Sequence, residues 1–295
     1  MRAFARRSPL LGIMVSLALT AGGQSGVKVE IDEVVDNRMS EGPMTGGLEL
    51  RVKLSGSGLD RVTAARLLVK DARDDGGNAL GKQSGPDDFT PREYNSGTLS
   101  VSLPSPKRTA TAARVKGTVE LFVPARDPSA VVKIDKGLAK LDAPLSAKAL
   151  KAAKVSITPL SPAGYAALMK ARKVTPEDIE KIRARGKAEG VPEKEIELAI
   201  GLAQAFDSMD AEPPEGTVLL SGKEGDFDRI FRVDVLGADG KPVDMTMRST
   251  STRGEDSIMT LQPSQPLPAN AALQITLLTD KARMSVPFEL NVPLP

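Results

Sequence analysis

The sequence predicts a mainly β protein made of two tandem antiparallel β-sandwich domains, the second with a small α-helical insertion. Three observations lead to this fold class. Many short segments alternate between apolar and polar residues, which is the period of a half-buried strand. Several of these segments recur in the same order at a nearly constant offset. One stretch late in the chain has the period of a helix instead.

The segment 1–23 has the layout of a cleavable secretory signal peptide. Three arginines and no acid stand among the first seven residues, and an apolar run at 9–21 leads into small residues. That run is shorter than the roughly 20 residues of a membrane-spanning helix. We expect cleavage near residues 21–23, and general secretion rather than twin-arginine transport because Pro9 does not suit that motif. The mature protein is then secreted or periplasmic, with no transmembrane segment.

The composition excludes several chemistries. The chain has no His, no Cys and no Trp, and its formal net charge is +2. Without His or Cys, a Ser-His-Asp triad, a thiol nucleophile and an ordinary zinc or copper site cannot form. A near-neutral charge gives no long-range attraction for phosphate backbones, which argues against a nucleic acid partner. We assign no catalytic, cofactor-binding or metal-binding residue and expect no cofactor.

An internal repeat divides the chain into two domains. Three pairs of segments match in the same order: 52–56 with 218–222, 60–61 with 228–229, and 113–124 with 282–293. In the last pair, six residues are identical at the same places. We therefore expect a first sandwich at 27–145 and a second at 150–295.

The strands of both copies have one apolar and one polar face. Residues 48–54 alternate strictly, and so do 113–123 and 284–292. Two-faced strands separated by Gly, Pro, Asp and Asn are typical of antiparallel sheets that pack on each other, as in an immunoglobulin-like sandwich or a related Greek key. Pro287 cannot donate to a ladder, which predicts that the last strand lies at an edge or contains a bulge.

The helical insertion lies in the second copy, at about 161–214. Thr175, Pro176 and two following acids provide an N-cap, a proline at the first helical position and negative charge in the first turn. Farther along, an apolar stripe occupies one face of a second helix and consists of Ile196, Ala199, Ile200, Ala203 and Phe206. We expect this stripe to pack on the protein's own sheet. If it is exposed instead, it is a site for a protein partner.

Two acidic segments share features with known kinds of site. Residues 71–78 have some features of a calcium loop, but Arg73 and Lys82 stand where that loop needs ligands, so a hairpin turn is favoured. Asp87 and Asp88 offer the paired carboxylates that a glycosidase needs, but nothing around them indicates a sugar cleft.

These patterns favour a non-enzymatic exported protein that acts as a binding or structural scaffold in the bacterial envelope or outside the cell. The insertion distinguishes the two copies, so we expect any protein partner to bind there. The alternative is a carboxylate-based or calcium-assisted hydrolase that acts on an extracellular polymer. A third hypothesis is that the protein is a purely structural pair of domains that binds no ligand.

Overall fold

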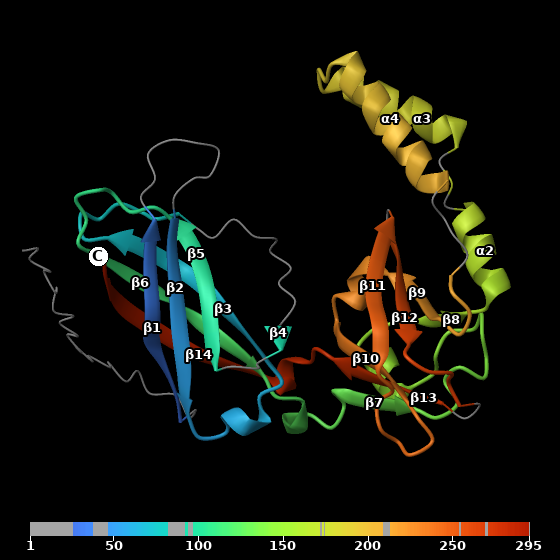
Figure 1. Ribbon diagram of the computed structural model, residues 1–295, viewed down its shortest axis with the longest axis horizontal. Coiled ribbons are helices and arrows are strands. Elements are labelled where there is room, and N and C mark those ends of the chain that lie inside the picture. Colours follow the sequence, from blue (N-terminus) through green and yellow to red (C-terminus); the bar gives the residue numbers. More distant parts are fainter. Residues whose placement is uncertain are drawn as a thin grey trace, which may run out of the picture.

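The computed structural model describes residues 26–37, 47–81, 92–93, 97–171, 173, 175–208, 213–253, 255–268 and 271–294. This part of the chain is mainly β, with four antiparallel sheets. Figure 1 shows two lobes that lie side by side, with helices extending from the second lobe. The expected signal peptide, 1–23, lies outside the described residues.

The first lobe pairs a three-stranded sheet with a four-stranded sheet. The former has the order β1 (Val27–Asn37), β2 (Gly47–Gly56), β5 (Thr98–Pro104). The latter has the order β14 (Arg283–Pro293), β6 (Ala112–Phe122), β3 (Ala64–Asp74), β4 (Arg92–Glu93). A 3-10 turn, η1 (Leu59–Arg61), connects β2 to β3.

The second lobe also contains a three-stranded and a four-stranded sheet. The former has the order β10 (Ile230–Leu236), β13 (Ala272–Leu277), β7 (Val131–Ile134). The latter has the order β11 (Met245–Arg253), β12 (Asp256–Pro263), β9 (Val218–Lys223), β8 (Thr158–Leu160). Two short helices accompany these strands, α1 (Lys148–Ala152) and α5 (Glu224–Phe227).

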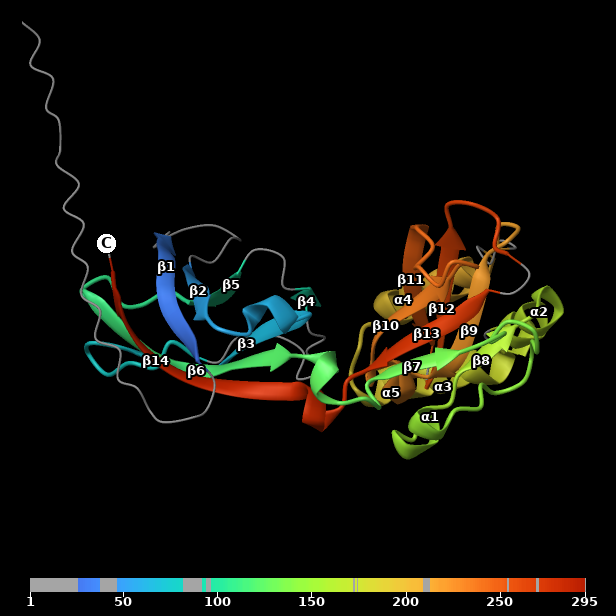
Figure 2. The same cartoon turned by 90° about the horizontal axis from the view of Figure 1, so that it is seen from below.

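The strand pairing crosses the boundary that the repeat suggested. β14 pairs with β6 along its whole length, from Arg283 opposite Phe122 to Pro293 opposite Ala112, and β7 pairs with β13. Figure 2 shows each pair running side by side within its lobe. The matching segments 113–124 and 282–293 are therefore neighbours in one sheet rather than equivalent strands of two copies. Residues 150–295 do not form one continuous domain, because their last strand belongs to the first lobe.

Other matching segments do occupy corresponding positions. β2 and β9 are each followed by a short helical turn and then by a strand of the opposite sheet, β3 or β10. The matches 52–56 with 218–222 and 60–61 with 228–229 fall at this crossing from sheet to sheet.

Pro287 fits its strand because β14 is the outer strand of its sheet. The amides of Val123 and Leu294 donate to the carbonyls of Ala282 and Thr111, at the two ends of the β6–β14 ladder. Since hydrogen-bonded pairs alternate in an antiparallel ladder, the odd-numbered residues of β14 direct their backbone outward. The missing N–H of Pro287 therefore leaves no gap in the ladder, and the prediction of an edge strand is confirmed.

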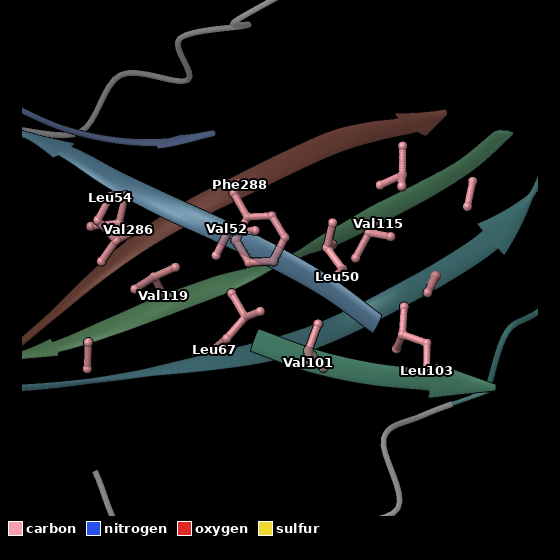
Figure 3. Packing of buried hydrophobic residues seen from close by; sticks show 14 of the residues in the cluster. Leu50, Val52, Leu54, Leu67, Val101, Leu103, Val115, Val119, Val286 and Phe288 are labelled. Atoms are coloured by element: carbon pink, nitrogen blue, oxygen red, sulfur yellow. The ribbon is translucent and has the colours of Figure 1, made fainter. Parts of the chain in front are cut away.

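The core of the first lobe depends on β14. Figure 3 shows Val286 and Phe288 from β14 packed among leucines and valines of β2, β5 and β6. Phe288 lies opposite Gly117 of β6, where a Cβ atom would stand 2.7 Å from the Phe288 ring and 2.2 Å from the Leu68 carbonyl oxygen. Only glycine leaves room for the ring to lie across β6 at this point.

The expected insertion contains three helices, α2 (Pro162–Ala171), α3 (Pro176–Ala188) and α4 (Glu193–Ser208). The predicted N-cap of α3 is confirmed: Thr175 Oγ1 accepts from the amide of Asp178 at 3.2 Å, and the Asp178 carboxylate accepts from the amide of Thr175 at 3.1 Å. Among the described helices, none has the length and apolar character needed to cross a membrane.

The two lobes are joined by two antiparallel connections that share a small core. The amide of Val123 donates to the carbonyl of Ala282, and the amide of Leu277 donates to the carbonyl of Ala130, each at 2.7 Å. Between the connections, Phe122 of β6 packs against Phe231 of β10, with ring centroids 5.1 Å apart and ring planes inclined by 50°. Further apolar residues complete this junction core: Ala64, Ala130, Ala282 and Leu278. The junction thus fixes one lobe against the other by packing as well as by covalent connection.

Asp127 organises the first of these connections, between η2 (Pro124–Arg126) and β7, opposite η3 (Asp280–Ala282). It is buried, and its Oδ1 accepts from the amide of Ser129 at 2.9 Å and from its hydroxyl at 2.7 Å. The nearby hydroxyl of Thr279, the hydroxyl and amide of Ser129, and the charge of Lys281 hold the pKa of Asp127 below its ordinary value. The folded junction therefore favours the carboxylate over the carboxylic acid.

We predict that Asp127→Asn lowers the free energy of unfolding at neutral pH and that the difference from the unsubstituted protein disappears in acid. A carboxylate whose pKa is lowered by folding contributes stability above its unfolded pKa, about 3.9, and that contribution is lost as the pH falls through the folded value. Urea titrations of both proteins near neutral pH and at successively lower pH, starting from the unfolded pKa and continuing below it, measure this difference. A difference that persists unchanged in acid would contradict the role of the charge.

Candidate functional site

The acidic segments considered in the sequence do not form a described site. Within 71–78, the carboxylate of Asp74 accepts from the amide and the side chain of Asn78, each at 2.8 Å, at the end of β3. This is a turn held by its own side chain, as the hairpin interpretation predicts. Asp87 and Asp88 lie outside the described residues. Nowhere in the described part of the chain do three His, Cys, Asp or Glu residues gather closely enough to hold a metal ion.

The helical insertion offers the first candidate site because α3 and α4 form a hairpin that extends away from the sheets (Figure 1). Ile196 and Ile200 of α4 are only 3% and 4% exposed. A Cβ atom at Gly186 of α3 would lie 2.7 Å from the side chain of Ile196, so glycine permits close packing of the two helices. The prediction that the apolar stripe packs on the sheet is wrong for Ile196, which is covered by the partner helix of its own hairpin. Ala199 is exposed, and the side chains of Ala203 and Phe206 lie outside the described residues.

An ion pair reinforces the hairpin on its polar side. Nε of Arg183 on α3 lies 2.9 Å from Oε1 of Glu197 on α4, and Nη1 of Arg183 lies 2.9 Å from Oε1 of Glu180. The hydrogen bond from Arg183 lowers the pKa of Glu197. Each of these side chains is more than one-third exposed, so the pair contributes little free energy in water. Its effect is to set the register of α3 against α4.

The opposite side of α4 exposes a second apolar strip. Leu198 is 70% exposed and Leu202 is 56% exposed, and the two lie one helical turn apart. Ala199 and Gly201, beside them, are exposed as well. The sequence contains the signal for this strip, since two leucines four residues apart share a helix face, but it does not show which of the two opposite apolar faces of α4 is covered. We call Leu198, Ala199, Gly201 and Leu202 the leucine strip.

Comparison with known proteins finds no relative: no family model, no curated protein and no solved structure matches the chain. The leucine strip is therefore identified from exposure alone. Most large apolar side chains of the described residues are buried, whereas the strip places two leucines in water on one helix. Exposed apolar side chains that share a face are characteristic of protein-binding surfaces.

We predict that Ile196→Ala loosens the hairpin whereas Leu198→Ala does not. Truncating a buried isoleucine costs about 2–5 kcal/mol through lost transfer free energy and a cavity, while an exposed position changes stability by roughly 0.5 kcal/mol or less. Hydrogen exchange of the α3 amides measures the effect, with faster exchange in Ile196→Ala only. Equal exchange rates in the two variants would mean that Ile196 does not hold α3 and α4 together.

Proposed function

We propose that the protein is a non-enzymatic binding scaffold, exported to the bacterial envelope or beyond it, and that the leucine strip of the α3–α4 hairpin captures a protein partner. The single observation that carries this proposal is the exposure of Leu198 and Leu202 on α4, a helix whose two isoleucines, Ile196 and Ile200, are already buried. A helix that has satisfied its internal packing and still presents leucines to water gains free energy when a partner covers them.

The two lobes supply the scaffold for this hairpin. Each lobe combines a three-stranded with a four-stranded antiparallel sheet, which supports an immunoglobulin-like class for both. The hairpin extends from the second lobe, between β8 and β9. The chain enters the hairpin from β8 through α2 and leaves it toward β9, so both ends of the insertion return to the same lobe.

Export is supported by the first 23 residues, whose cationic start, short apolar run and small residues suit a signal peptide. Because the chain contains no cysteine, it forms no disulfide bond that the redox state of its compartment could break. We propose a mature chain that begins near residues 22–24.

Site-specific photo-crosslinking tests the leucine strip directly. A photoreactive residue replaces Leu198 in one strain of the producing organism and Lys181 in a control strain; Lys181 is exposed on α3, where its side chain is 67% accessible. We expect one protein to crosslink at position 198, and the Leu202→Glu substitution to abolish that adduct because a charge replaces a buried contact.

The control site must give no such adduct, and mass spectrometry of the mature chain must place its start near residues 22–24. Equal crosslinking from both positions, or none from position 198, would contradict the assignment of the leucine strip. A chain that retains its first residues in the mature protein would contradict export by signal cleavage.

A further inference from the structure

Helix α1 places two lysines on the outside of the second lobe. Lys148 and Lys151 are exposed and lie one helical turn apart, whereas Leu150, on the opposite side of the helix, is only 1% exposed. Lys154 follows the helix and is exposed as well. Figure 2 shows α1 at the margin of the lobe, beyond β7. Three ammonium groups therefore extend into solvent from one short stretch of the chain.

A fourth cation, Arg229, lies at the end of α1. Its Nη1 donates to the carbonyl of Ala153 at 2.8 Å and to the carbonyl of Lys154 at 3.3 Å. The side chain of Arg229 is exposed, so its charge faces solvent beside the last of the three lysines. We call Lys148, Lys151, Lys154 and Arg229 the basic patch.

The carboxylates near the basic patch do not neutralise it. Among the described residues, no acid forms an ion pair with any of its four cations. In the segment that leads to α1, Asp135 is already paired with Lys133 at 3.5 Å. Asp226 and Asp228 precede Arg229 in the sequence, and the carboxylate of Asp226 accepts a backbone amide of its own helix cap at 3.2 Å. Four cations minus these two acids still leave an excess of two positive charges.

Two lysines of the basic patch stand where the local backbone favours other residues. The amide of Val155 donates to the carbonyl of Leu150 and the amide of Lys154 to that of Lys151, which is the Schellman ending of a helix. Lys154 is the left-handed residue of this ending, with φ of 54°, where glycine is preferred. Lys148 is the first residue of α1, where the helix dipole favours an acid. Both positions thus keep a cation that the fold itself does not require.

We infer that the basic patch docks the protein on a surface of anionic phospholipids. Lysine ammonium groups on flexible stems are point charges that need no fixed geometry, and clusters of such cations bind the phosphates of anionic headgroups. Protein interfaces, in contrast, are depleted in lysine and apolar at their centres, whereas this patch offers only the methyl group of Ala152 between its lysines. The hollows lined by Phe231 and Met259 and by Leu168 and Ser221 contain no residue of the patch. This site does not depend on the leucine strip.

Sedimentation with lipid vesicles tests the inference. The chain is produced from residue 24, because the cationic and apolar segment 1–23 could itself bind lipid; every described strand and helix begins at Val27 or later. Vesicles of phosphatidylcholine alone are compared with vesicles that also contain phosphatidylglycerol. We expect the chain to sediment with the anionic vesicles and not with the neutral ones, and added salt to weaken binding because exposed charges are screened.

Two triple variants separate the position of the charges from their number. The test variant carries Lys148→Gln, Lys151→Gln and Lys154→Gln. The control variant loses the same three charges from exposed lysines of the first lobe and carries Lys28→Gln, Lys53→Gln and Lys70→Gln. We expect the test variant to bind anionic vesicles more weakly by about fivefold for each lysine removed, and the control variant to bind as the unsubstituted chain does.

The single variant Lys154→Gly separates binding from folding. Glycine suits the left-handed backbone at this position, so we expect a melting temperature at least as high as that of the unsubstituted chain. Binding to anionic vesicles should nevertheless weaken by about fivefold because one cation is lost. If Lys154 had only a structural role, its replacement would lower the melting temperature and leave the binding of the folded protein unchanged.

Several results would overturn the inference. Equal sedimentation with both kinds of vesicle removes the requirement for anionic lipid, and sedimentation with neither removes the site. Equal weakening in the test and control triple variants assigns binding to the net charge of the chain instead of the patch. If polyglutamate binds through the patch lysines and anionic vesicles do not, the occupant is an acidic protein and the assignment to lipid is wrong.

Discussion

The antiparallel ladder between β6 and β14 is the constraint on which the rest of the structure depends. This ladder contains eleven residue pairs. It returns β14 to the first lobe after the chain has passed through the second lobe. Val286, Phe288 and Val292 on β14 are buried in the core of the first lobe. The first lobe therefore cannot complete its core until the chain has passed through the second lobe, so the two lobes are linked in folding as well as in sequence.

The same crossing explains the junction. The chain leaves the first lobe after β6, supplies β7 to the second lobe, and returns after β13 to supply β14. Each lobe thus receives one outer strand from beyond the junction, placed beside β13 in one lobe and β6 in the other. Two connections instead of one allow a shared core around Phe122 and Phe231, and the buried carboxylate of Asp127 stabilises the first connection. The second lobe, which carries the leucine strip, is in this way held against the first lobe.

The sequence predicts where the strands lie better than it predicts which strands pair with each other. Alternation at 48–54 identifies which side chains are buried, because a strand exposes opposite faces at successive residues. At 113–123 it does so except at Thr118 and Phe122, which are buried on the face that alternation assigns to solvent. It does not identify the adjacent strand, since any two amphipathic strands with matching faces can pair. The similarity of 113–124 to 282–293 therefore suggested equivalent strands, whereas the two segments are neighbours. The same reasoning applies to Ile196, whose helical spacing predicts burial but does not specify which surface covers it.

The candidate sites were harder to predict because they depend on exposure. Leu198 and Leu202 differ from buried leucines only in what surrounds them, and that follows from the path of α3. A buried acid is visible in the sequence as well: Asp234 stands between Val233 and Val235 in a strand that is otherwise mostly apolar. A buried acid requires a cationic partner. Arg232 is a near neighbour in the sequence, but Arg248, fourteen residues away, becomes a partner only when β10 and β11 are placed on facing sheets.

An engineered disulfide tests the β6–β14 ladder most directly, because the chain contains no cysteine of its own. Arg114 and Asn291 lie opposite each other in the register, and they form one of the closer, non-hydrogen-bonded pairs that can accommodate a disulfide. The double variant Arg114→Cys, Asn291→Cys should oxidise in air to a crosslinked monomer, seen by thiol titration and by non-reducing electrophoresis, while Gln274→Cys with Asn291→Cys should remain reduced. A disulfide in the second pair and free thiols in the first would place the last strand in the second lobe and contradict this account of the fold.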